Sequence, residues 1–272
     1  MDDSECFCVL GPLQVSAGGR AIFIPAGKQR ALLAALLVNA NEVVPVSELV
    51  DRLWGDGLPS RPRRALHTML TRLRQSLEAD GAGLGRRIRT APGGYTIEVA
   101  PCCLDLRRFD WLTRLARAAG DRGDLAGEAD LLTEALALWR GQPLADIESE
   151  SLHREVAPRL REGWLTTSER YHDVCLALGR HDQIVGELRA LTFKYPFHER
   201  RWTQLMTALY RCGRRGEALE AYAAMRTSFR DELGVEPGEE ARRLHLAMLH
   251  ADEELLPVRG PLPREQYQQR AS

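Results

Sequence analysis

The hydrophobic pattern of the chain changes once, close to residue 100, and this change constrains the architecture more than any other feature. Before it, short runs with the period of strands alternate with longer runs that have the period of helices. From Cys102 onward the helical pattern continues alone. We therefore predict an α+β domain over residues 1–100, an all-α domain over residues 101–254, and a Pro-rich tail or linker over residues 255–272.

The first domain opens with three short segments that are typical of strands, at residues 6–11, 13–17 and 20–24. Gly18 and Gly19 stand between the second segment and the third. A glycine pair between two apolar runs favours a tight hairpin turn, because glycine adopts positive φ without strain. These segments predict a small antiparallel sheet.

Three helices and a second hairpin follow. The helical segments are residues 27–42, 44–57 and 63–79, and Ser47 is expected to cap the second of them. The hairpin covers residues 86–99 and turns at a Pro-Gly-Gly sequence. Strands, three helices and then a hairpin are the order of a winged helix-turn-helix, which we predict for this domain.

The third helix has two chemically different faces. At helical spacing, one stripe is made of leucines: Leu66, Leu70, Leu73 and Leu77. The remaining surface offers basic and polar side chains: Arg63, Arg64, His67, Thr68, Thr71, Arg72 and Gln75. Arginine can bind guanine or phosphate, glutamine can bind adenine, and threonine can contact phosphate or the thymine methyl group. We predict that this helix reads the major groove of DNA; the alternative is a solvated face without a partner.

The second hairpin is predicted to be a basic wing that contacts DNA. Its candidates are the arginines of the first run and the residues of the tip: Arg86, Arg87, Arg89, Gly93, Gly94 and Tyr95. We expect Arg87 and Arg89 to share one side of a strand and Arg86 to share the other with Ile88. Such a wing can clamp phosphates or enter the minor groove, although a basic edge strand can also serve only to prevent aggregation. Lys28 is a further candidate, since a helix N-terminus attracts phosphate.

The charge of the chain is unevenly distributed. The formal net charge is −1, but eight arginines and only two acidic residues fall within residues 61–89. Attraction between exposed charges is screened over about 8 Å, so this local excess matters more for DNA binding than the total does. The basic stretch coincides with the third helix and the start of the wing.

The second domain is predicted to be a set of tetratricopeptide-like (TPR-like) helix hairpins. Gly179 and Gly213 lie 34 residues apart, and each is expected to end one helix and open the next. Ala218 occupies the position of the small residue in such a repeat, Ile184 replaces it in the earlier copy, and Ala129 lies one place out of register. Stacked hairpins of this kind bind proteins rather than catalyse reactions.

The sequence contains no catalytic, cofactor or metal motif, so we predict that the protein is not an enzyme. The pairs Cys6/Cys8 and Cys102/Cys103 lack the spacing of a zinc site, and we expect them to be small buried hydrophobic residues. The acidic N-terminus lacks the basic region of a secretory signal, and no apolar stretch is long enough for a bilayer. These features predict a cytoplasmic protein without cofactors or membrane contact.

Three segments resemble the OmpR-type winged-helix domain of the Streptomyces antibiotic regulatory proteins: FCVLGPLQVSAGGRAIFIPAGKQRALLAALLVNANEVVPVSELVDRLWGDGLP, RRALHTMLTRLRQSLE and GGYTIEV. Three later segments resemble the bacterial transcriptional activator domain of the same family: LDLRRFDWL, ALALWRGQPLADI and LTFKYPFHERRWTQLMTALYRCGRRGEALEAYAAMRTSFRDELGVEPGEE. The resemblance covers about residues 5–253.

The resemblance implies a transcriptional activator of secondary-metabolite clusters that binds direct repeats near promoters and recruits RNA polymerase holoenzyme. It further implies that the third helix and the wing contact double-stranded DNA, and that the activator domain lets protomers associate as a homodimer, side by side on the DNA. Because only about five residues precede the first strand, we expect no phosphoacceptor domain in front of it. Larger relatives continue into a nucleotide-binding domain, so the chain is expected to be either a small member or a truncated one.

Two other functions stay open on the sequence alone. One is a helical-repeat adaptor whose winged module contacts proteins, which the near-neutral net charge would suit. The other is a nucleotide-dependent enzyme, for which Gly27-Lys28 offers only a fragment of a phosphate-binding loop.

Overall fold

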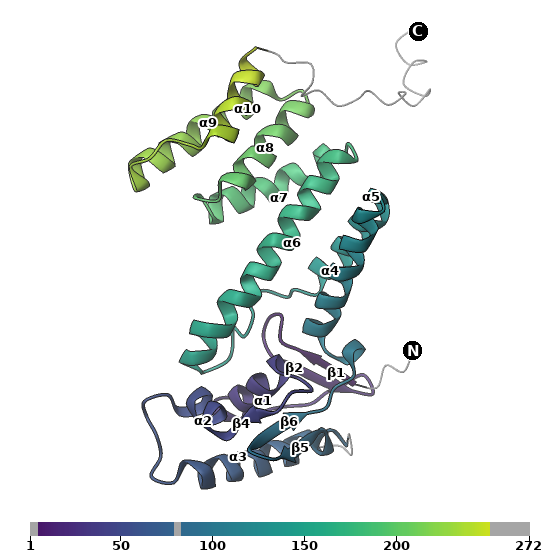
Figure 1. The fold of residues 1–272 in the computed structure, drawn as a ribbon, viewed down its shortest axis with the longest axis vertical. Coiled ribbons are helices and arrows are strands. Elements are labelled where there is room, and N and C mark those ends of the chain that lie inside the picture. Colours follow the sequence, from purple (N-terminus) through teal and green to yellow (C-terminus); the bar gives the residue numbers. More distant parts are fainter. Residues whose placement is uncertain (1–4, 79–82, 251–272) are drawn as a thin grey trace. The chain divides into compact units, whose positions relative to one another are not determined.

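The computed structural model describes residues 5–78 and 83–250. They form two compact units, which divide the chain between Ser168 and Glu169, inside helix α6 (Ala157–Ala177). The first unit contains a winged helix-turn-helix with further helices attached to it, and the second is all-helical (Figure 1). The predicted fold class is confirmed. None of the described helices is both long and apolar enough to cross a membrane.

The N-terminal sheet has three antiparallel strands in the order β1-β2-β3. These are β1 (Glu5–Cys8), β2 (Gln14–Ala17) and β3 (Arg20–Ala21). Gly18 and Gly19 turn the chain between β2 and β3 with φ of 55° and 75°, the positive values that a two-residue hairpin turn needs. The predicted sheet is confirmed, although its strands are shorter than the apolar runs.

Three helices follow: α1 (Lys28–Val38), α2 (Val46–Trp54) and α3 (Pro62–Leu77). The prediction that Ser47 caps α2 is wrong. The helix begins at Val46, the residue before Ser47, and Pro45 takes the cap position. Helix α3 ends at Leu77, before the predicted end at Ala79, which lies outside the described residues.

A second sheet carries the wing. Its strands are β4 (Val44–Pro45), β5 (Ile88–Ala91) and β6 (Gly94–Ile97), in the order β4-β6-β5. Gly93 forms the hairpin turn with Pro92 and has a φ of 82°, as expected for a glycine after proline in a tight turn. A Cβ on Gly94 would lie 2.1 Å from the carbonyl oxygen of Val44, so β4 and β6 can pair at this distance only because residue 94 is glycine.

The first helices after the wing belong to the first unit. They are η3 (Pro101–Cys103), α4 (Asp105–Asp121), α5 (Leu125–Ala137), a π-helical turn η4 (Leu152–Val156) and the start of α6. Phe109, Leu144 and Leu160 from this part share one apolar core with Phe7 and Leu37 of the winged helix. Residues after position 100 therefore complete the apolar core of the winged helix.

The buried carboxylate of Asp105 joins the two parts of this unit. It accepts hydrogen bonds from the amides of Val9 and Leu10 at 2.8–2.9 Å and from the amide of Leu106 at 2.8 Å. Arg140 reinforces the junction, because its side chain lies 3.4 Å from this carboxylate and its amide donates to the Leu10 carbonyl at 2.8 Å. Burial raises the pKa of Asp105, although the amide hydrogen bonds oppose that shift.

The second unit contains, after the end of α6, helices α7 (His181–Lys194), α8 (Glu199–Arg211), α9 (Arg215–Ser228) and α10 (Glu239–Leu249), with a π-helical turn η5 at Phe229–Leu233. Gly179 and Gly213 both have a φ of 77° and separate consecutive helices, as predicted. The amides of Arg180 and Arg214 donate to carbonyls five residues earlier, each at 2.9 Å, so the two turns are built alike. This geometry confirms the helix-hairpin repeat.

Candidate nucleic-acid interface

Helix α3 separates an apolar stripe from a basic and polar face. The leucine stripe is at most 1% exposed and packs into the core: Leu66, Leu70, Leu73 and Leu77. All residues that the sequence assigned to DNA reading on this helix are exposed: Arg63, Arg64, His67, Thr68, Thr71, Arg72 and Gln75. In Figure 1 the helix runs along the outer edge of the first unit.

The two threonines of this face are held in place by the helix itself. The hydroxyl of Thr68 donates to the Arg64 carbonyl, and that of Thr71 donates to the His67 carbonyl, both at 3.0 Å. Such bonds fix the side-chain rotamer. The oxygen lone pairs and the methyl groups are then available to contacts from outside the helix.

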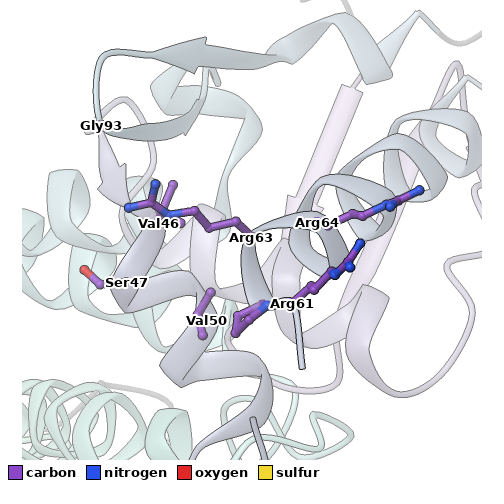
Figure 2. A pocket seen from close by; sticks show the side chains of 8 residues that line it. Val46, Ser47, Val50, Arg61, Arg63, Arg64 and Gly93 are labelled. Carbon is purple, nitrogen blue, oxygen red and sulfur yellow. The ribbon is translucent and has the colours of Figure 1, made fainter. Parts of the chain in front are cut away.

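A groove of about 680 Å³ lies where the starts of α2 and α3 meet the tip of the wing (Figure 2). Its lining includes three arginines and no acidic residue: Val46, Ser47, Val50, Arg61, Pro62, Arg63, Arg64 and Gly93. Figure 2 shows Arg63 reaching towards Val46, whereas Arg61 and Arg64 extend to the opposite side. The amide of Val46 donates to the Gly93 carbonyl at 3.1 Å and so holds the wing tip against α2. The charge of this groove suits an anion such as a backbone phosphate.

The base of the wing differs from the prediction. Arg86 and Arg87 lie in a 3-10 turn, η2 (Leu84–Arg87), and not in the strand, so they do not alternate with Ile88. Arg87 is half-buried and donates to both carboxylate oxygens of Glu5 at 2.8 and 3.0 Å, which raises its pKa. Its guanidinium thus fastens the wing to β1, while 41% of the side chain stays exposed. Arg86 and Arg89 are exposed.

Three other candidates occupy different environments. Gly94 lies in β6, is buried between the neighbouring strands β4 and β5, and serves the packing of these strands. Lys28 is exposed, and its ammonium group donates to the Leu53 carbonyl and lies 5.5 Å from the centre of the Trp54 ring, so it contacts the end of α2. Tyr95 is half-buried in β6. Among the tip residues, Gly93 is exposed.

Arg74 has a role that the sequence analysis missed. Its guanidinium donates to the Ile88 carbonyl at 3.1 Å and lies 3.5 Å from the hydroxyl of Thr90, so it fixes α3 against β5. In the sequence it is one more arginine of the basic stretch. Only its position beside the leucine stripe could have suggested an inward partner.

The cysteines are not the small buried residues that we expected. Cys6 and Cys102 are exposed, and Cys8 and Cys103 are half-buried. Both pairs lie at the edge of the N-terminal sheet. Cys6 and Cys8 belong to its edge strand β1, and Cys102 and Cys103 belong to η3, which lies beside that strand. Within residues 5–78 and 83–250, no group of three or more histidine, cysteine or acidic side chains is arranged to hold a metal ion.

Comparisons with known proteins identify the family. The model of the bacterial transcriptional activator domain matches residues 104–249, and that of the C-terminal domain of transcriptional regulatory proteins matches residues 24–97. Regulatory protein DnrI of Streptomyces peucetius is 37% identical over 250 residues, which cover 90% of this chain and 92% of DnrI. The chain belongs to the Streptomyces antibiotic regulatory protein family. As a member of this family it is a transcriptional regulator and not an enzyme.

Other members of the family are longer than this chain. Regulatory protein AfsR of Streptomyces coelicolor is 39% identical over 247 residues, which cover 90% of the chain but 24% of AfsR. The solved structure of Mycobacterium tuberculosis EmbR, in complex with a low affinity phosphopeptide, matches with a TM-score of 0.83 and 34% identity. That match covers 94% of this chain and 66% of the EmbR chain.

The family models and the compact units divide the chain at different places. The two models meet near residue 100, whereas the compact units meet after Ser168. The activator-domain model therefore begins inside the first unit, at the helices that complete the winged-helix core.

Proposed function

We propose that this regulator is a sequence-specific DNA-binding activator that inserts α3 into the major groove. Arg64, Thr68, Thr71 and Gln75 face the bases in this proposal, and Arg72 and His67 flank them. Arg86, Arg89 and Gly93 contact the backbone from the wing, and the groove at Arg63 receives a phosphate. The observation that carries the proposal is that the entire polar face of α3 is exposed while its leucine stripe is buried.

In the same proposal, residues 1–100 read DNA and residues 101–254 contact protein partners. Two protomers bind side by side on direct repeats near a promoter and recruit RNA polymerase holoenzyme. A secondary-metabolite (antibiotic) biosynthetic cluster is the proposed target. Membership of the family supports these points, as does the helix-hairpin architecture, which is typical of protein-binding surfaces.

The electrostatic part is tested by fluorescence anisotropy on a labelled non-specific duplex at several salt concentrations. With about six phosphate contacts, the logarithm of the association constant should fall against the logarithm of salt with a slope of about −5. The double change Arg64→Glu and Arg72→Glu should flatten the slope and weaken binding by more than about tenfold. Arg117→Glu, at an exposed position of α4, is the control for charge and should have little effect. A flat salt response of the unchanged protein contradicts the proposal.

The sequence-specific part is tested by selecting binding sites from a random duplex library. Enriched sites should contain direct repeats whose centres lie about one helical turn, roughly 10 bp, or a multiple of it apart. Nuclease protection on a selected site, with and without RNA polymerase holoenzyme, then reports recruitment. Extended protection towards the transcription start is expected only when both proteins are present. Enrichment of single sites or inverted repeats contradicts side-by-side binding.

A further inference from the structure

Cys6 and Cys8 form a thiol pair on the edge of the N-terminal sheet. Because residues two apart in a strand face the same side, their side chains meet across Phe7, and the two sulfur atoms lie 3.4 Å apart. Cys6 is exposed, Cys8 is half-buried, and Phe7 is fully buried on the other side. The pair therefore combines one sulfur that a small oxidant can reach with a second sulfur next to it.

The two thiols are also chemically different. The hydrogen bond between them lowers the pKa of Cys6 to about 7 and raises that of Cys8. The lowered pKa favours the thiolate form of Cys6, which is the more exposed of the two sulfurs and lies against the Cys8 sulfur. An accessible thiolate beside a second cysteine is the combination found in cysteines that undergo reversible oxidation.

We propose that Cys6 and Cys8 are a site of reversible oxidation by hydrogen peroxide. In the first step the Cys6 thiolate attacks one peroxide oxygen, the O–O bond breaks, and uptake of one proton gives Cys6 sulfenic acid and water. In the second step the Cys8 sulfur attacks the Cys6 sulfur, the S–O bond breaks, and the Cys8 proton leaves with the hydroxyl group as a second water. The two sulfurs have lost two electrons and peroxide has gained them. A dithiol reductant restores both thiols.

The disulfide would change the conformation of β1. In an extended strand the Cα atoms of residues two apart are separated by about 6.4–6.8 Å, which is at the upper limit of what a disulfide allows. The bond must therefore draw Cys6 and Cys8 together and disturb the pairing of β1 with β2. The same strand carries Glu5, which holds Arg87 at the base of the wing, and Phe7, which pairs with Leu104. Oxidation should thus loosen both of these contacts.

The proposal is tested on the full chain in buffer that contains a metal chelator. After a short exposure to a few equivalents of hydrogen peroxide, free thiols are alkylated and the peptides are analysed by mass spectrometry. The peptide with Cys6 and Cys8 should lose two hydrogen atoms and resist alkylation, and dithiothreitol should reverse both effects. The double change Cys102→Ser and Cys103→Ser is the matched control and should leave this product unchanged. A cross-link from Cys6 to Cys103, or oxidation of Cys102 before Cys6, overturns the proposal.

Two further measurements assign the roles of the sulfurs. In Cys8→Ser, Cys6 should stop at the sulfenic acid, which dimedone captures, whereas Cys6→Ser should leave Cys8 unoxidised. If Cys8→Ser does not fold, the alkylation rate of Cys6 in the unchanged protein still tests the proposal. At pH 7 Cys6 should react with iodoacetamide about tenfold faster than the cysteine of a short unstructured peptide, because its pKa is lowered to about 7. Equal rates overturn the proposal.

The conformational effect of oxidation is measured by amide hydrogen exchange. Faster exchange of the β1 amides after oxidation is expected, and unchanged exchange contradicts the coupling of β1 to the wing.

Discussion

Asp105 is the residue on which long-range hydrogen bonds of the first unit converge. It is 7% exposed, and its carboxylate satisfies two amides of the segment that follows β1, almost a hundred residues earlier in the chain. A buried carboxylate is costly by itself, which is why its pKa is raised. Its removal is costlier, because the amides of Val9 and Leu10 then lose their partners inside the protein.

We expect Asp105→Ala to lower the free energy of unfolding by about 2–4 kcal/mol, since two buried amides become unsatisfied. Urea denaturation followed by circular dichroism measures the effect. Asp121→Ala, at an exposed position at the end of the same helix, should change stability by less than about 0.5 kcal/mol. Equal effects of the two changes would show that the hydrogen bonds of Asp105 contribute little.

His181 in the second unit predicts a dependence of stability on pH. Burial lowers the pKa of this side chain in the folded state, and Arg211 lowers it further. The unfolded chain takes up the proton near pH 6.5, so stability should fall as pH drops below about 6.5 until the folded-state pKa is passed. His181→Leu should reduce the difference in stability between pH 7 and pH 5, measured by denaturant titration. His250→Leu, at an exposed position, should leave that difference unchanged. A steeper fall in His181→Leu would contradict this sign.

At the scale of elements, the two glycines Gly94 and Gly163 occupy opposite environments in the same unit. A Cβ at position 94 meets the backbone of β4, whereas a Cβ at position 163, in α6, would lie 3.6 Å from the ring of Phe109, an ordinary contact. The same substitution should therefore act in opposite directions at the two sites.

We expect Gly94→Ala to destabilise the first unit by about 2 kcal/mol or more, because the strands must separate. Gly163→Ala should stabilise it by about 0.5–1 kcal/mol, since alanine favours the helix over the unfolded chain. Thermal unfolding of both variants decides the matter. A tolerated alanine at position 94 would mean that β4 is not needed for the wing.

Local patterns in the sequence predicted most elements and failed where partners are distant. The leucine spacing of α3 and the glycine pair of the first hairpin act within one element, so the sequence alone reveals them. Strand β4 has two residues and no periodicity, and it forms only because β6 returns to it from about fifty residues later. For the same reason the sequence could not predict the ion pair of Arg87 with Glu5, and the contact of Arg87 with DNA stays a prediction. The exposed face of α3, by contrast, could be predicted, because the leucine spacing defines the buried stripe and the other positions of the helix must then face solvent.

At the scale of the molecule, the first unit extends well past the winged helix. Besides the bonds of Asp105, Arg30 pairs with Asp146, and Arg52 pairs with Glu155 at 2.6 Å. Ser149 donates to the Arg52 carbonyl at 2.6 Å. These contacts join residues below 100 to residues above 140, and the apolar core is continuous across them. We infer that the stability of the winged helix depends on the helices after it.

A fragment of residues 1–168 should therefore melt at least about 10 °C above a fragment of residues 1–100. The shorter fragment exposes Phe7 and leaves the amides of Val9 and Leu10 without Asp105. Differential scanning calorimetry and limited proteolysis of both fragments measure the difference. Equal melting temperatures would show that the winged helix is self-sufficient.

The carboxylate tie from Asp105 to the segment after β1 also limits how such regulators can exchange parts. A chimera joined at residue 100 would take the Asp105 carboxylate from one parent and the amides of Val9 and Leu10 from the other, so the two sides of this contact would not be matched. Transplanting only the exposed side chains of α3 changes the DNA-facing surface and leaves this contact unchanged. A working hybrid should thus be easier to obtain from a handful of grafted surface residues than from a whole swapped module.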